Sequence, residues 1–347
     1  MAKANLIFLL NVFFLFVLVP AKAQEQENTL EQEMNDYLAQ TSDAQSDAQK
    51  DTQTLSDTQT MVMDLENFVT DVYEVIEQAP APEPERLQPS QKKLQRQQLE
   101  KEGHPFTTDS FLNAAKEGRK KLVLRFLSAG MRVGARAPGG ETALHYAVLG
   151  GMIDMAQVLV KFGADPNVIN NAGDSPLHLA VARNNIYMAA LLMENGANPN
   201  LSNRQGWTSM NIAAAQGLER IFVLMQRRGG NINARTRVGM TPLMLAIWKG
   251  HTRLAKYLIA VGASTTSTDP NGNNAFLLAV NHNHPDIVKI LLAKGADPDQ
   301  RNLRNWSALA IALDNNNRHI ANILYAAGAE TPGKKRPRGP RLNPDPR

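Results

Sequence analysis

The sequence has no cysteine among its 347 residues, and it contains only three tryptophans. The absence of cysteine excludes disulfide bonds, thiolate nucleophiles and thiolate metal sites. The sequence also lacks a glycine-rich phosphate loop after an expected strand and lacks a nucleophile-elbow motif. We therefore expect no enzymatic activity, no cofactor and no metal site.

Long apolar runs are also scarce, and the most prominent one lies at the start of the chain. Lys3 precedes the run Leu6–Val19, which is followed by a small-residue pattern ending at Ala23. This order is typical of a secretory signal peptide, and the run is shorter than the ~20 residues of a membrane-spanning helix. We expect residues 1–23 to be a signal peptide cleaved after Ala23; an uncleaved anchor is the competing interpretation. The expected destination is the periplasm, with secretion as the alternative.

After residue 23, the chain has an acidic segment followed by a longer basic one. Residues 24–90 contain 16 acidic and 2 basic side chains, whereas residues 91–347 carry a net charge of +16. Segments of opposite charge attract each other or different partners. The basic, proline-rich tail, residues 332–347, is interpreted as a disordered end, with contact to an anionic or membrane surface as the alternative. We expect no nucleic-acid partner.

The acidic stem, residues 24–78, is of low complexity at its centre, which is typical of a disordered linker. Steps of three and four residues nevertheless place one stripe along it, as in a coiled coil. The stripe is apolar only near its end, at Val62, Leu65, Val69, Val72 and Ile76. We expect a short oligomerising or docking helix over residues 60–77, with a continuous coiled coil as the weaker alternative.

A linker is expected over residues 79–104. Its first part alternates alanine, proline and glutamate, which favours an extended spacer. Its second part, KKLQRQQLEKE, is charged, and a helical turn or two is the alternative there.

Small residues recur every 33 positions through the rest of the chain, which indicates one structural unit copied seven times. The glycine column is Gly130, Gly163, Gly196, Gly229, Gly262, Gly295 and Gly328. The alanine column is Ala114, Ala147, Ala180, Ala213, Ala246, Ala279 and Ala312. An alanine inside a helix allows close stacking of neighbouring units.

Residues 170–202 illustrate the unit. Ser175 is expected to cap a first helix that begins at Pro176, and Gly196 is expected to end a second helix. Each unit is therefore a turn, a helix, a tight break, a second helix and a loop. A column of large residues is expected to fill the space between second helices: Phe126, Leu159, Leu192, Met225, Leu258, Leu291 and Leu324.

The boxes Gly173-Asp-Ser-Pro-Leu-His-Leu-Ala180 and Gly163-Ala-Asp-Pro-Asn167, with their relatives in other units, resemble the ankyrin-repeat family. The resemblance implies an all-α repeat solenoid with hairpin-like turns over residues 105–331. The first and last of the seven units are expected to be polar caps. The box departs from the family pattern at Thr208–Asn211, Asn274–Leu277 and Ser307–Ala310, which places local rigidity in question.

Two histidines, His145 and His178, occupy matched positions in this box. The resemblance implies that they form structural hydrogen bonds, and neither has the partners of a metal or catalytic site. His282 and His284 lie at a more exposed position, yet two histidines alone make a weak site.

The resemblance also implies which positions face a partner. The residue after each turn glycine is expected to project from the hairpin tip: Glu141, Asp174, Trp207, Met240, Asn273 and Trp306. Two columns at the ends of the first helices are expected to line a concave face: Leu149, Ala182, Ala215, Trp248, Asn281 and Asp314, then Gly150, Arg183, Gln216, Lys249, His282 and Asn315.

All three tryptophans fall in these columns, and large aromatic residues are enriched among binding hot spots. The alternative is that each tryptophan packs on its neighbouring turn. We expect a non-catalytic scaffold that binds a protein partner, and the basic side chains favour an acidic rim on that partner. The partner-binding residues are expected to be Trp207, Met240, Trp306, Trp248, Lys249, Arg183, Gln216 and His282. Alternative functions are a secreted effector that acts on another cell and an envelope tether that self-associates through residues 60–77.

Overall fold

The computed structural model describes Val72 and residues 87–330. The chain divides into two units, Met1–Thr60 and Met61–Arg347, and all the described residues belong to the second. The expected signal peptide, almost all of the stem and the basic tail lie outside the described residues. Within the described part, no helix has the length and apolar character required to cross a membrane.

The described residues form fifteen helices joined by turns. The first is α4 (Pro89–Lys101), and it precedes seven helix pairs. The pairs are α5 (Thr108–Lys116) with α6 (Lys120–Ser128), α7 (Ala143–Leu149) with α8 (Ile153–Lys161), α9 (Pro176–Ala182) with α10 (Ile186–Glu194), α11 (Ser209–Gln216) with α12 (Glu219–Arg227), α13 (Pro242–Trp248) with α14 (Thr252–Ala260), α15 (Ala275–Asn281) with α16 (Pro285–Ala293), and α17 (Ala308–Asp314) with α18 (Arg318–Ala326).

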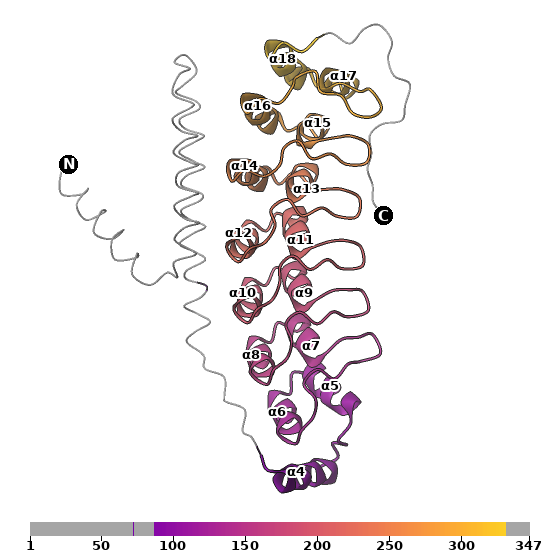
Figure 1. Cartoon of the computed structure of the whole chain (residues 1–347), viewed down its shortest axis with the longest axis vertical. Coiled ribbons are helices and arrows are strands. Elements are labelled where there is room, and N and C mark those ends of the chain that lie inside the picture. The colour runs from indigo at the N-terminus through magenta and orange to yellow at the C-terminus, as the bar shows by residue number, and fades with distance from the viewer. Residues whose placement is uncertain (1–71, 73–86, 331–347) are drawn as a thin grey trace, which may run out of the picture. The chain divides into compact units, whose positions relative to one another are not determined.

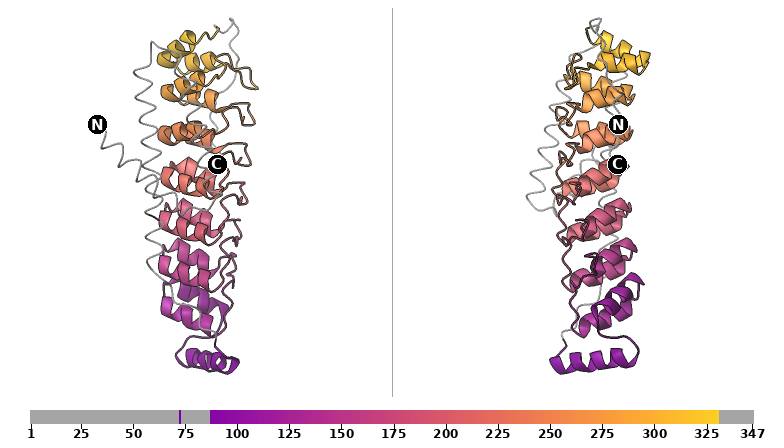
Figure 2. Two further views of the ribbon diagram at one scale, coloured as in Figure 1. Left: turned by 60° about the vertical axis from the view of Figure 1, so that its left-hand side comes forward. Right: turned by 90° about the vertical axis from the view of Figure 1, so that its right-hand side faces the viewer.

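The seven pairs stack in chain order into a two-layered solenoid (Figure 1). The first helices of the pairs, α5 to α17, form one layer, and the second helices, α6 to α18, form the other. The turns between repeats project beyond the first-helix layer, as Figure 2 shows from two further directions. The sequence prediction of seven helical repeats is confirmed.

Capping side chains explain where the first helices begin. The Ser175 hydroxyl accepts a hydrogen bond from the backbone N–H of His178, and Pro176 occupies the first helical position. Thr241 and Asn274 cap the equivalent helices in the same way. The tight break before each second helix needs a left-handed residue, which is Asn184 in the third repeat with φ of 52°. Asparagine tolerates this region better than other residues with a side chain.

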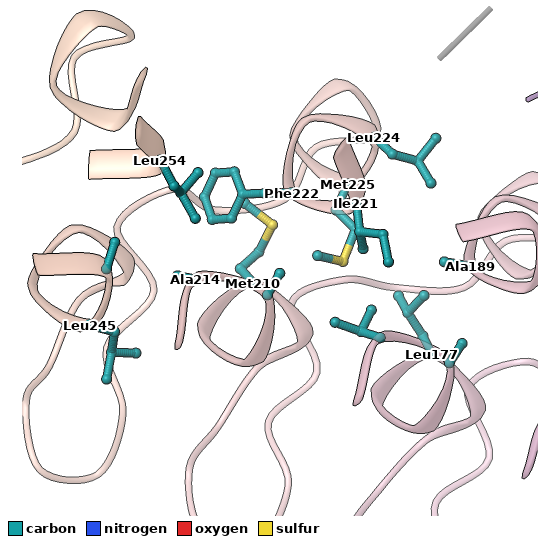
Figure 3. Packing of buried hydrophobic residues seen from close by; sticks show 14 of the residues in the cluster. Leu177, Ala189, Met210, Ala214, Ile221, Phe222, Leu224, Met225, Leu245 and Leu254 are labelled. Atoms are coloured by element: carbon teal, nitrogen blue, oxygen red, sulfur yellow. The ribbon is translucent and has the colours of Figure 1, made fainter. Parts of the chain in front are cut away.

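The core lies between the two helix layers and continues through all seven repeats. Every member of the alanine column and of the large-residue column is buried. In Figure 3, Phe222 extends from α12 toward Leu254 of α14, and Met210 of α11 lies beneath it. The predicted burial of both columns is confirmed, and one hydrophobic cluster continues from repeat to repeat.

The segment expected as a linker differs from the prediction over α4, which runs for 13 residues. Leu99 is fully buried, and α4 packs against α6 at the start of the stack. The Arg96 Nε donates to the carbonyl of Ala129 at 2.8 Å, and its guanidinium lies 4.6 Å from the Phe106 ring centroid. Arg125 pairs with Glu102 directly after α4. The stack is therefore capped by a separate helix as well as by the polar side chains of the first repeat.

Candidate partner-binding surface

The two box histidines join neighbouring repeats. The Nδ1 of His178 accepts a hydrogen bond from the backbone N–H of Ser175 at 3.2 Å, which leaves Nε2 to donate to the carbonyl of Trp207 at 3.0 Å. His145 makes the matching contacts with Thr142 and with the carbonyl of Asp174. These contacts fix the tautomer, because an acceptor at Nδ1 requires the proton at Nε2. The structural role implied by the family resemblance is confirmed by these bonds.

Burial lowers the pKa of both His145 and His178 below the ordinary value of 6.5, while their backbone carbonyl partners oppose the shift. Both imidazoles are therefore neutral near pH 7. Each ring is enclosed within the stack, with both nitrogens occupied by hydrogen bonds. Within the described residues, no group of histidine and carboxylate side chains could hold a metal ion.

The column expected at the hairpin tips instead closes the turns. The backbone N–H of Trp207 donates to Oδ1 of Asn203, and its carbonyl accepts from the N–H of the same residue. Trp306 is held in the same way by Asn302, and Met240 is held by Thr236. Because both backbone groups of this residue face into the turn, its side chain returns toward the core.

Met240 therefore does not project, and the expectation that it stands exposed at the hairpin tip is wrong. Its side chain is buried, with 8% exposed, as is that of Asn273 in the same column. Trp207 and Trp306 are half-buried and pack against the hydrophobic core. The packing interpretation weighed for the turn tryptophans thus accounts for much of their surface.

The true tips lie two and three residues before the column. Their exposed members include Arg204, Gln205, Arg237, Val238, Leu303 and Arg304. Leu303 is 79% exposed. Neighbouring tips are joined through the backbone, as in the bond from the N–H of Arg204 to the carbonyl of Ala172 at 3.1 Å. A rigid backbone thus presents side chains that the core does not use.

The remaining predicted residues lie at the C-terminal ends of the first helices. Arg183, Gln216 and Lys249 are exposed, whereas Trp248 and His282 are half-buried. The Nζ of Lys249 lies 3.8 Å from the ring centroid of Trp248, a cation–π contact that holds both side chains. Burial, followed by the charge of His284, lowers the pKa of His282.

Positive charge dominates the turns, which comprise residues 136–142, 169–175, 202–208, 235–241, 268–274 and 301–307. They contain six arginines and three acidic residues. Of the three acids, Asp269 is buried and accepts hydrogen bonds from Asn271 and Asn273. The turn arginines were absent from the predicted site because the tip was assigned to the residue after each turn glycine, which is two to three residues too late.

The comparisons with known proteins agree with this architecture. The model of the family described as ankyrin repeats (3 copies) matches residues 111–203, 188–269 and 261–334. The Notch-regulated ankyrin repeat-containing protein of Xenopus tropicalis is 36% identical over 73 residues, which is 20% of this chain and 64% of that protein.

Two further relatives give similar values. Notch-regulated ankyrin repeat-containing protein A of Danio rerio is 38% identical over 67 residues, which is 18% of this chain and 60% of that protein. The protein of Homo sapiens is 33% identical over 73 residues, covering 20% of this chain and 64% of the relative. The match thus spans less than two thirds of each relative's own length.

Ankyrin repeats generally mediate protein–protein interaction, and proteins of this family are generally non-catalytic scaffolds. The family model extends over more than half of this chain. The stacked helix pairs, the histidine bonds between repeats and the family match lead to one conclusion: the chain belongs to the ankyrin-repeat family.

Proposed function

We propose that this protein is a non-catalytic scaffold that binds one protein partner through the turn tips and the adjoining ends of the first helices. The main support is that exposed arginine and apolar side chains stand on turns that backbone hydrogen bonds join to one another, as between Arg204 and Ala172 and between Leu303 and Asn271. Val238 and Leu303 are exposed at the tips beside Arg237 and Arg304. Apolar side chains surrounded by positive charge are typical of a recognition surface.

Trp248 is the strongest hot-spot candidate on this surface. Its ring is already ordered by Lys249, so a partner would fix it at little further entropic cost. Arg183 and Gln216 lie at the first-helix ends of the two preceding repeats. Trp207 and Trp306 remain candidates only through the exposed part of each ring, and Met240 is removed from the site.

The excess of arginine in the turns favours an acidic rim on the partner. Charged residues at an interface rim mainly raise the association rate, and salt screens this effect. Binding is therefore expected to weaken as ionic strength rises.

The test uses photo-cross-linking from a residue inserted at Gln205, followed by identification of the attached protein by mass spectrometry. The purified partner is then titrated against the W248A/K249E and R204E/R237E variants. A lost hot spot weakens binding by about 2 kcal/mol or more, which is roughly thirtyfold. Arg318→Glu is the charge control, because Arg318 is exposed at the start of α18 and lies outside the turns. Unchanged affinity in both surface variants, with unchanged melting temperature, would refute the proposed surface.

We also propose that the protein is exported, with the periplasm as its destination and secretion as the alternative. The order of charge, apolar run and small residues at the N-terminus supports this proposal. Fractionation of producing cells, with N-terminal sequencing of the product, tests it: a mature chain starting at Gln24 is expected. A chain that retains its first residues in the cytoplasm would contradict export. Detection inside recipient cells would favour the effector alternative.

A further inference from the structure

The second helices of the middle repeats are buried on more sides than those at the C-terminal end of the stack. α16 buries Ile287, Val288 and Leu291, which face the core. By contrast, α10 buries the six consecutive residues 188–193, and α12 buries the five residues 221–225. Successive helical residues are about 100° apart, so five or six consecutive buried residues extend around the whole circumference of the middle of the helix. Residues nearer the helix ends, such as Tyr187 and Arg220, remain exposed.

Equivalent positions along the repeats show which of the second helices are buried on the side facing away from the first helices. One outward position is almost fully buried in repeats two to five: Val158 (0% exposed), Leu191 (4%), Leu224 (0%) and Tyr257 (5%). At the same position, Ile290 and Ile323 of repeats six and seven are partly exposed. The repeat by itself therefore leaves this position open. Figure 3 shows Leu224 pointing from α12 away from α11, whereas Met225 points toward the core.

We propose that residues 60–77 form a helix that lies lengthwise across α8, α10, α12 and α14 of the same chain. Val72 is the described residue of this segment: it is helical, 1% exposed and part of the same hydrophobic cluster as the repeats. It is also a member of the apolar stripe with Leu65, Val69 and Ile76. The apolar stripe of residues 60–77 needs a surface to pack against, and the row of outward positions on α8, α10, α12 and α14 provides one.

The dimensions of helix and strip agree. A helix rises about 1.5 Å per residue, so the 18 positions of residues 60–77 extend over about 27 Å. Packed helices lie about 8–10 Å apart, so the three intervals from α8 to α14 extend over about 24–30 Å. The same helix would end before α16, where the outward position becomes exposed.

The charges agree as well. Residues 60–77 contain five acidic residues and no basic residue. The four helices α8, α10, α12 and α14 together carry five basic and three acidic residues, and two of the basic residues are paired within the repeats: Arg253 with Glu219 and Lys256 with Asp286. An acidic helix on this basic and apolar face gains electrostatic attraction in addition to apolar burial. The face of the second helices is separate from the turns that are proposed to bind a partner.

Cross-linking from residue 72 tests the proposal in the full chain. A photo-reactive residue replaces Val72 in an equal mixture of unlabelled and ¹⁵N-labelled protein, and mass spectrometry locates the attachment sites. Attachment to α8–α14 within chains of one isotope is expected. The same residue at Leu94, which is exposed on α4, is the control for random collisions. Attachment between chains of different isotopes would instead assign the strip to a second copy, and an absence of attachment to α8–α14 would also overturn the proposal.

A second measurement uses the absence of native cysteine. Val223→Cys and Asn322→Cys occupy the same repeat position, but Val223 is buried and Asn322 is exposed. Alkylation at position 223 is expected to be about tenfold slower or more, as for a docked state populated at ten to one. Val72→Glu in the full chain should raise the rate at position 223 without changing that at 322. An unchanged rate at 223 would mean that the repeats themselves bury it and would refute docking.

Discussion

The box histidines act as inter-repeat connectors, and one repeat performs the same task without a titratable group. Asn211 occupies the equivalent position in the fourth repeat. Its Oδ1 accepts from the N–H of Thr208 at 3.0 Å, and its Nδ2 donates to the carbonyl of Ala234 at 2.9 Å. The connection thus needs one acceptor and one donor, and an amide supplies both, although its donor bonds to a carbonyl 23 residues on in the chain, whereas each histidine bonds to one 29 residues on.

This equivalence predicts how stability depends on pH. The pKa of buried His145 and His178 lies below 6.5, so the unfolded chain binds more protons as pH falls below that value. The stabilising contribution is complete above pH 6.5 and is lost as pH falls toward the lowered pKa. Replacing both histidines with asparagine should keep folding near neutral pH and flatten this dependence. Denaturant titrations between about pH 7 and pH 5 measure it, given the ordinary histidine pKa of about 6.5. An equally steep dependence in the double variant would assign it to other groups.

Ser209 is a second residue at which the repeats themselves suggest a substitution. Its hydroxyl is buried and has no hydrogen-bond partner in the described structure. The equivalent residues Pro176 and Pro242 begin their helices with the proline favoured at the first position. Ser209→Pro should therefore stabilise the chain by about 0.5–1 kcal/mol, because it removes an unsatisfied group and restricts the unfolded state. Chemical denaturation checks the sign, and a destabilised variant would disprove the explanation.

Among the elements of each repeat, the turns have the strictest steric requirements for their residues. Gly206 has φ of 78°, and a Cβ at this residue would lie 2.8 Å from the backbone nitrogen of Arg237 in the next turn. Gly229 has φ of 80°, but its Cβ would meet nothing within 4 Å. The same backbone conformation is therefore required for two different reasons.

These two glycines form a matched pair for mutation to alanine. Gly229→Ala should cost about 1–2 kcal/mol, the penalty of left-handed backbone alone. Gly206→Ala should cost more, because its methyl group separates neighbouring turns as well. Melting temperatures of the two variants give the comparison. Equal losses would mean that the turns move apart without cost.

The helices could be predicted from the sequence more accurately than the positions of the turn tips. The 33-residue spacing and the capping residues were sufficient for the helices, because each helix end depends on local chemistry at residues such as Ser175 and Asn184. The turn column was placed wrongly because Met240 has a tip-like position in sequence, whereas its backbone bonds to Thr236 turn its side chain inward. α4 was underestimated because Leu99 is its one fully enclosed apolar contact, and a single residue gives no periodic pattern.

At the scale of the whole molecule, stability is shared between neighbours, since a repeat stack gains most of its free energy at interfaces between units. The two ends of the repeat stack differ in how well their apolar residues are covered. α4 covers the start of the stack, whereas Leu313 and Tyr325 in the last repeat are 48% and 44% exposed. Unfolding of the repeat stack is therefore expected to begin at its C-terminal repeat.

Leu99→Ala tests the importance of the N-terminal cap. Leucine-to-alanine changes in a core cost about 2–5 kcal/mol, and here the loss falls on the first interface. Hydrogen exchange should accelerate in α5 and α6 while protection in α11 and α12 is retained. Uniform loss of protection over all repeats would instead show that the stack unfolds as a single cooperative body.

The bonds between successive repeats also constrain how the gene can change length. Asn167 and Asn200 each donate to a carbonyl 29 residues later and accept from an N–H 31 residues later, at Asn198 and Asn231. An insertion or deletion of one whole unit restores these partners in the next copy. A change of any other length within the repeats would misalign the hydrogen bonds at its site. Duplication and loss of complete units is thus the evolutionary route by which this architecture can lengthen or shorten.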